Sequence, residues 1–165
     1  MPLYSSDCAY PEYQEAFFYY VFGVSEMDCY GAIDFEAEKA TLFIPRLDEF
    51  LKIWMTVMDK EAYEKKYPLI DSVQYVDTME EFFNNLKPET VFVNLGVNSD
   101  SGLTTMIAEE KWYQASGAKT DTKILHNIVS ESRVYKNDEE MEIMRWASKI
   151  TCEAHCNVMR NVKPG

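Results

Sequence analysis

Three side chains near the end of the 165-residue chain are of types that bind metal ions. Cys152, His155 and Cys156 stand at positions i, i+3 and i+4 of a predicted helix, so they lie on neighbouring turns and can face one way. Thiolates and imidazoles are zinc ligands, but a structural zinc site takes four of them. His126 is a weak fourth candidate, because the chain has only 2 histidines. We therefore interpret the three as residues of a packed helix.

The segment GVNSDSG, residues 96–102, follows a predicted strand, where phosphate-binding loops occur. It has neither the GxxxxGK[ST] pattern nor a lysine, and it lacks the acidic residue that ends a calcium-binding loop. A turn rich in glycine and asparagine is the better interpretation. No nucleophilic triad is marked either, since neither histidine has a recognisable setting and GxSxG is absent.

Trp54 has two competing interpretations. It falls in residues 48–58, where large apolar side chains recur at helical spacing and Asp48 is a plausible N-cap. A tryptophan on an amphipathic helix usually belongs to the core, and we favour that placement. Because a polar, lysine-rich segment follows directly, Trp54 is also a candidate for an interface.

The composition excludes several classes of protein. The chain has 28 acidic and 16 basic residues, a formal charge of −12, which argues against nucleic acid and anionic membranes as partners. No apolar run is long enough to span a membrane, and the first residues lack the pattern of a signal peptide. With 47% hydrophobic residues, the chain can form a folded core. We interpret the 4 cysteines as free thiols in a cytosolic protein.

The elements that position these residues alternate between strands and helices. The continuous apolar run 16–24 predicts a buried strand that ends at Gly23, and residues 29–35 and 39–45 predict a hairpin that Pro45 ends. The later predictions are a helix over 48–58, a polar helix over 59–67, a strand over 72–76, a helix over 77–86 and a strand over 89–95. The alternation favours an α/β fold with a mixed β-sheet flanked by helices.

Two predicted helices carry the pattern of a capping box, a side chain that caps a helix paired with an acid three residues later. Asp77 with Glu80 marks the start of the helix over 77–86, and Asn137 with Glu140 marks the start of the last helix. That last helix has one apolar stripe, made of Ile143, Ala147, Ile150, Ala154 and Val158. We expect part of the surface that covers the stripe to lie beyond residue 165. Residues 122–136 are the least legible and predict a short strand and a helical turn.

Several stretches of the sequence occur in an informative order. FFYYVFGVSEMDCYGAID (17–34) precedes TLFIPRL (41–47), and VQYVD (73–77) precedes GVNSDSG (96–102). The segment 131–155 then has Arg133, Lys136 three residues later, and an acidic start of a helix. On that helix follow Glu142, the apolar residue Ile143, and Ala147. Together they resemble the amino-terminal region of eukaryotic Xaa-Pro dipeptidases (prolidases), metallopeptidases of the creatinase and aminopeptidase P superfamily.

The resemblance implies two parts. Residues 1–130 would form a creatinase/prolidase-type N-terminal domain, and residues 131–165 a linker and the first helix of the missing pita-bread catalytic domain. In the family that domain holds two divalent metal ions, commonly manganese, through two Asp, one His and two Glu, and the metals activate a water molecule to attack the bond before proline. None of those ligand motifs is in this chain, so the resemblance implies no catalytic residue, no metal and no activity for the chain alone.

The resemblance also implies partners. They are the protein's own C-terminal catalytic domain, a second copy in a homodimer and an Xaa-Pro dipeptide substrate, in the cytoplasm. Trp54, in the loop around residues 52–60, would close over a dipeptide bound by the other subunit. The family usually has a further helix and strand before the region that matches SSDCAY. A protein without that strand would have an open sheet edge that favours self-association.

Two alternatives stay open. An aminopeptidase P takes longer peptides and needs a more open cap, so the length of the segment 52–67 discriminates between the two peptidases. A non-enzymatic pita-bread protein, such as a histone-chaperone subunit, has lost the metal ligands and binds protein partners, and a basic partner suits an acidic chain. A reading frame that continues past Gly165 with the five metal ligands would favour the dipeptidase.

Overall fold

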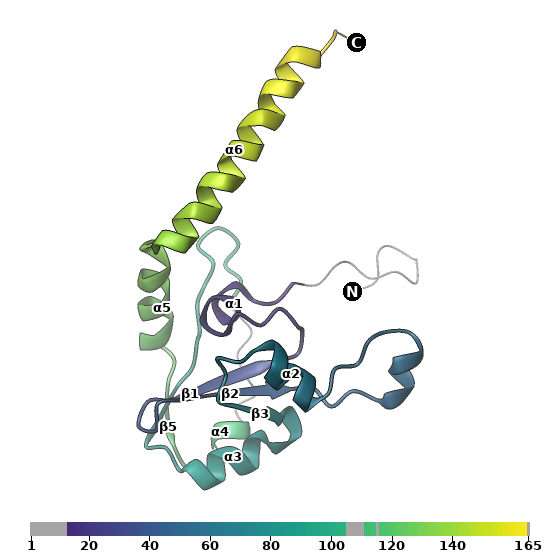
Figure 1. Cartoon of the computed structure of the whole chain (residues 1–165). Helices are drawn as coiled ribbons and strands as arrows, with labels where there is room; N and C mark the ends of the chain where they lie inside the picture. The colour runs from purple at the N-terminus through teal and green to yellow at the C-terminus, as the bar shows by residue number, and fades with distance from the viewer. Residues whose placement is uncertain (1–12, 105–110, 115, 165) are drawn as a thin grey trace. The chain divides into compact units, whose positions relative to one another are not determined.

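The structure, a computed structural model, describes residues 13–104, 111–114 and 116–164. The chain divides into two compact units, Met1–Val129 and Ser130–Gly165. Figure 1 shows that the first unit combines strands and helices, whereas the second is helical. In the part of the chain that is described, no helix has the length and apolar character needed to cross a membrane.

A three-stranded mixed sheet forms the centre of the first unit. β1 (Tyr30–Asp34) and β2 (Lys39–Ile44) make an antiparallel hairpin, and β3 (Ser72–Tyr75) runs parallel to β2 on its other side. The Asp34 carboxylate holds the hairpin turn by accepting hydrogen bonds from the backbone N–H groups of Glu36 and Ala37. The predicted hairpin and the predicted strand over 72–76 are both confirmed.

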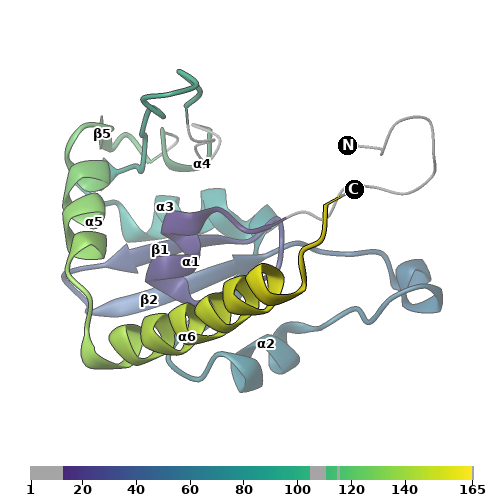
Figure 2. The ribbon, with the colours of Figure 1, turned by 90° about the horizontal axis from the view of Figure 1, so that it is seen from above.

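The central strand β2 is buried on both faces. Leu42 and Ile44 pack with side chains of α1 (Ala16–Phe22) and α2 (Lys60–Lys66), whereas Phe43 packs with those of α3 (Met79–Leu86). Figure 2 shows α1 and α2 on one side of the sheet and α3 on the other. The sequence of a strand that is covered by helices on both faces is typically a continuous run of apolar residues, as in the second half of β2.

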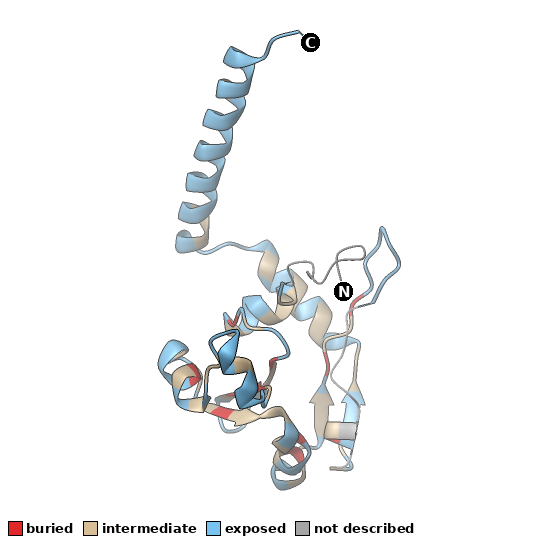
Figure 3. Cartoon of the chain, turned by 90° about the vertical axis from the view of Figure 1, so that its right-hand side faces the viewer, coloured by how far each residue is buried: buried red, intermediate tan, exposed pale blue. Residues whose placement is uncertain are grey.

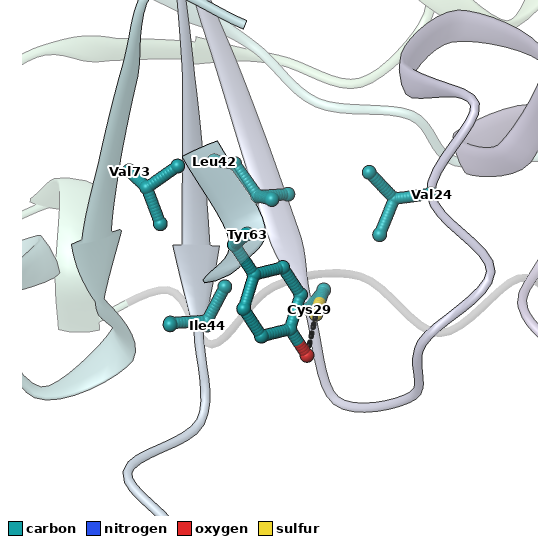
Figure 4. Close-up of a cluster of buried hydrophobic side chains, with 6 residues drawn as sticks. All are labelled: Val24, Cys29, Leu42, Ile44, Tyr63 and Val73. Carbon is teal, nitrogen blue, oxygen red and sulfur yellow. Dashed lines mark hydrogen bonds between the residues drawn. The ribbon is translucent and has the colours of Figure 1, made fainter. Parts of the chain in front are cut away.

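A buried cluster fills the space between the sheet and the helices α1 and α2. Its members, drawn in Figure 4, are Val24, Cys29, Leu42, Ile44, Tyr63 and Val73. The Cys29 thiol lies 4.0 Å from the Tyr63 hydroxyl oxygen. Burial raises the pKa of Cys29 to about 11 and also raises the pKa of Tyr63. The thiol is therefore protonated at neutral pH and is a poor nucleophile.

Most of the run 16–24 is the helix α1 (Ala16–Phe22), so the prediction of a buried strand is wrong. The Glu15 carboxylate caps α1 by accepting hydrogen bonds from the N–H groups of Phe17 and Phe18. Gly23 ends the helix in the left-handed region, with φ 67°, and its N–H donates to the carbonyl of Tyr19. Because a short apolar run fits a strand and a buried helix equally well, these end signals decide the structure.

A second, smaller sheet completes the first unit. β4 (Thr90–Phe92) pairs in parallel with β5 (Lys119–Asp121), and α4 (Lys111–Gln114) precedes β5. Val91 and Val93 pack in the same cluster as Phe43. The α/β class and a mixed sheet flanked by helices are confirmed, with the strands divided between two sheets.

The helices after the hairpin differ in how they begin. Asp59 caps α2 by accepting a hydrogen bond from the Ala62 N–H, which confirms the polar helix over 59–67. The capping box predicted for Asp77 and Glu80 is wrong. A 3₁₀ turn over Val76–Thr78 precedes α3, and the Asp77 carboxylate pairs with an arginine instead of the helix.

The segment 122–136 contains a helix over residues 124–134, longer than the predicted helical turn, and the short strand predicted there is absent. α5 (Ile124–Val134) starts after Asp121, whose carboxylate accepts hydrogen bonds from the N–H groups of Lys123 and Ile124. The two bonds form a turn that leads into the helix.

The second unit contains the long helix α6 (Asp138–Asn161). Its predicted capping box is confirmed, since Asn137 accepts from the Glu140 N–H and Glu140 accepts from the Asn137 N–H. The large side chains of the predicted stripe, Ile143, Ile150 and Val158, are exposed, and Figure 3 shows α6 as exposed nearly throughout. The assignment of this unit to a catalytic domain stays a prediction.

Candidate functional site

The loop between β2 and α2 is the most unusual surface of the first unit. We call residues 45–58 the Trp54 loop; Figure 1 shows it projecting away from the sheet. It contains a 3₁₀ helix, Glu49–Ile53, which Asp48 caps by accepting a hydrogen bond of 2.9 Å from the Phe50 N–H. Asp48 is therefore a cap, as predicted, but the predicted helix over 48–58 is wrong beyond this short turn.

Large apolar side chains of the loop face solvent. Trp54 is 76% exposed, and Phe50, Ile53 and Met55 are exposed as well. The interpretation of Trp54 as a core residue is therefore wrong. The apolar residues of 48–58 do recur at helical spacing, but most of them lie on a short 3₁₀ helix and a loop away from the sheet, where there is no core to pack against. Apolar side chains grouped on one projecting loop are typical of a surface that contacts another molecule.

The first end of the loop is held by an ion pair. Arg46 donates to the Asp77 carboxylate through Nε at 2.7 Å and through an Nη at 3.2 Å. The guanidinium also lies over the Tyr75 ring, 3.8 Å from its centroid. The hydrogen bond from Arg46 lowers the pKa of Asp77, so this carboxylate stays charged over a wider range of pH.

The second end of the loop is held through α2. Met58 packs against the buried cluster of Figure 4, and Tyr63 belongs to that cluster. At the end of the helix, Lys66 and the Tyr67 hydroxyl both donate to the Glu26 carboxylate. Partial burial acts to raise the pKa of Glu26, but the hydrogen bonds from Lys66 and Tyr67 outweigh it and lower this pKa.

The Glu26 pairing predicts a pH-dependent contribution to stability. Because the folded pKa is below the usual 4.5, this stabilisation is complete above about pH 4.5 and is lost as pH falls through the lowered folded pKa. We expect Glu26→Gln to lower the Tm by about 2–4 °C at neutral pH and by less at pH 3, because the stabilisation decreases once the pH falls below about 4.5. Thermal unfolding by circular dichroism at both pH values measures the difference.

Glu61→Gln is the matched control, because Glu61 is an exposed residue of the same helix α2. We expect no pH-dependent difference from it. A Glu26→Gln deficit of equal size at both pH values would contradict the role of the charged carboxylate.

The turn over residues 96–102 has the structure expected of it. The Asn98 side chain accepts hydrogen bonds of 2.9 Å from the N–H groups of Asp100 and Ser101, and Gly102 has φ 72°. This is an asparagine-nucleated turn whose last position favours glycine, so the prediction of a glycine- and asparagine-rich turn is confirmed.

The cysteine and histidine residues considered as metal ligands do not form a site in the described part of the chain. Cys152, His155 and Cys156 lie on α6, and within the described residues no three His, Cys, Asp or Glu side chains are grouped as metal ligands. His126 pairs with the Asn94 amide oxygen at 3.0 Å and stacks on Phe17. The described residues therefore do not fit a two-metal site.

The cysteines that the structure describes are free thiols, as predicted: Cys29, Cys152 and Cys156. Cys8 lies outside the described residues. Cys29 is buried, whereas Cys152 is exposed.

The residues that sequence reasoning missed are Arg46, Tyr75 and Asp77. A usable signal was present, because Arg46 follows a predicted strand and Asp77 follows the next one. When two such strands are parallel neighbours, their carboxyl ends meet at one sheet edge, so residues that follow them lie together. The sequence did not specify that β2 and β3 are parallel neighbours.

Comparison with known proteins assigns the family. A family model described as "Aminopeptidase P, N-terminal domain" matches residues 1–92, more than half of the chain. The chain belongs to the aminopeptidase P N-terminal domain family. It is 41% identical over 92% of its length to human Xaa-Pro dipeptidase, and 38% identical over 100% to the mouse enzyme. This aminopeptidase P N-terminal domain spans about a third of the length of these curated relatives.

Solved structures agree on the fold. Aminopeptidase P from Escherichia coli, in its low-pH form, superposes with a TM-score of 0.74 at 20% identity, over 99% of this chain and 39% of that one. Proline aminopeptidase P II from Yersinia pestis gives 0.72 at 22% identity, over 99% and 40%. The fold of an aminopeptidase P N-terminal region, predicted by resemblance to creatinase and prolidase, is confirmed.

Proposed function

We propose that this chain is the non-catalytic N-terminal domain of an Xaa-Pro dipeptidase. The observation that carries the proposal is the 41% identity to human Xaa-Pro dipeptidase over 92% of the chain. A fungal protein named as a probable Xaa-Pro aminopeptidase is only 27% identical over a similar length. The dipeptidase is therefore the better match than an aminopeptidase P.

In this proposal the chemistry belongs to the part of the protein that follows residue 165. That part would hold two divalent metal ions, manganese in our proposal, which activate water to hydrolyse the bond before a C-terminal proline. Residues 131–165 would link the two domains and supply the first catalytic-domain helix. The exposed apolar stripe of α6 supports this assignment, because such a stripe is stable when a partner surface covers it.

The first unit would act by capping and by supporting a dimer in the cytoplasm. The Trp54 loop would close over an Xaa-Pro dipeptide held by the other subunit. The exposure of Trp54, and the anchoring of both ends of its loop, support a contact with something outside this domain. Closing an aromatic side chain over a site excludes water and long peptides, which suits an enzyme for dipeptides.

Activity assays with and without the rest of the protein test the proposal. We expect the full-length protein, loaded with Mn²⁺, to hydrolyse Ala-Pro and Gly-Pro, and the 165-residue chain to release no proline under the same conditions. Proline release measured by a colorimetric assay gives both rates.

Longer peptides separate the two peptidases. Ala-Pro-Ala should be cleaved at least about tenfold more slowly than Ala-Pro if the cap admits only dipeptides. Equal or faster cleavage of the tripeptide favours an aminopeptidase P. A full-length protein that is inactive with every divalent metal favours a non-enzymatic binding protein.

A further inference from the structure

Arg46 and Asp77 occupy equivalent places after two neighbouring parallel strands. Ile44 at the end of β2 pairs with Tyr75 at the end of β3. Arg46 and Asp77 each come two positions later, so the parallel register brings them to the same edge of the sheet. The ion pair is thus set by the register of two core strands.

The contact constrains the guanidinium in several directions at once. Two of its nitrogens meet the two oxygens of Asp77, at 2.7 and 3.2 Å, and its carbon lies 3.8 Å from the centroid of the Tyr75 ring. A forked pair with a carboxylate restricts rotation within the guanidinium plane, and the ring restricts movement out of it. Lysine offers neither restriction, because its ammonium is a point charge.

This ion pair joins the Trp54 loop to the rest of the unit. The other hydrogen bonds of the loop's described residues are internal: the N–H groups of Phe50 and Leu51 donate to Asp48, those of Trp54 and Met55 donate to the Leu51 carbonyl, and the Lys52 ammonium donates to Glu49. These bonds join the 3₁₀ helix and Trp54, which follows it, into one hydrogen-bonded segment. Its direction therefore depends on the two ends of the loop: Arg46, where the chain leaves the sheet, and Met58, which packs against the buried cluster.

We propose that Arg46, Asp77 and Tyr75 form a clamp that sets the direction of the Trp54 loop and thereby positions Trp54 for closure over a dipeptide. The proposal rests on the proposed capping function. Arg46 is then a positioning residue that acts through Trp54. Because Arg46 and Asp77 are 57% and 53% exposed, their pair contributes little to folding stability. Loss of the clamp should therefore alter substrate closure without unfolding the domain.

The test uses the full-length, metal-loaded protein with Arg46→Gln and, as a second variant, Asp77→Asn. We expect each to raise KM for Ala-Pro about two- to fivefold, the size of change that an exposed ion pair can produce, with kcat and the Tm nearly unchanged. Arg46→Lys should recover only part of the loss, because the forked contact and the stacking are gone. The double variant Arg46→Asp with Asp77→Arg restores an ion pair of reversed sign, so its KM should be closer to that of the unchanged protein than the KM of either single variant.

The matched control is Lys119→Ala, which removes an exposed ion pair to Glu89 away from the loop. We expect its KM to equal that of the unchanged protein. If Trp54→Ala raises KM while Arg46→Gln and Asp77→Asn do not, the proposed clamp is overturned, but the proposed closure of Trp54 over the substrate is supported. If Trp54→Ala has no effect, capping fails and the clamp fails with it. A KM increase that occurs together with a large loss of Tm would assign a structural role to the pair and overturn the clamp.

Discussion

Replacing Trp54 by alanine in the full-length, metal-loaded protein should lower kcat/KM for Ala-Pro by about 30-fold. The size follows from the 2 kcal/mol or more that a well-placed tryptophan contributes at a contact. Trp54 is 76% exposed in the domain, so its removal leaves the core unchanged and should not lower the Tm. Steady-state kinetics together with a thermal scan measure both quantities.

Two further variants make the Trp54 result specific. Trp54→Phe should restore most of the activity, because it keeps an aromatic ring at the same place. Leu69→Ala, which removes an exposed apolar side chain outside the loop, should have no effect. If Leu69→Ala and Trp54→Ala behave alike, the tryptophan has no particular role in closure.

Phe43→Ala should lower the free energy of unfolding by about 3–5 kcal/mol, the usual range for a buried phenylalanine. Phe43 is fully buried on the central strand, where it packs with Met79, Phe83 and Tyr113, and its ring lies edge-on to Phe82. Its removal leaves a cavity at the centre of the α3 side of the sheet. Urea denaturation of the 165-residue chain, followed by circular dichroism, measures the change.

The expected loss is a large part of the stability of a domain of this size, so the variant is expected to be partly unfolded at 37 °C. Phe35→Ala is the control, because it removes the same side chain from an exposed position after β1. It should change the free energy of unfolding by less than about 0.5 kcal/mol. Similar losses from the two variants would contradict the placement of Phe43 in the core.

The sequence by itself determined the features that depend on neighbours along the chain. The capping box of Asn137 and Glu140 and the turn around Asn98 were predicted and are present. Each is made by hydrogen bonds between residues three or fewer positions apart, so the residue types alone specify it. The hairpin was predicted from two neighbouring strand patterns and from Pro45, which ends the second one, and the structure adds that Asp34 holds the turn. Family membership was also predicted from the sequence, because it depends on motifs that occur in a fixed order along the chain.

Only the tertiary structure decided the features that depend on distant residues. The run 16–24 is apolar throughout, and its helical form follows from Glu15 and Gly23 at its ends and from packing against the sheet. Trp54 has the spacing of a core residue, yet its loop leaves the sheet and reaches no core. Burial is set by what lies opposite a side chain in space, and helical periodicity does not contain that information.

The candidate site shows the same division most clearly. Asp77 has the sequence pattern of a helix cap, but its partner is Arg46, which lies 31 positions away. Both interactions satisfy the same carboxylate, and the choice between them depends on β2 and β3 being parallel neighbours. Because that pairing is a property of the folded sheet, the contact of Arg46 with Asp77 at the base of the Trp54 loop could not be predicted from the sequence.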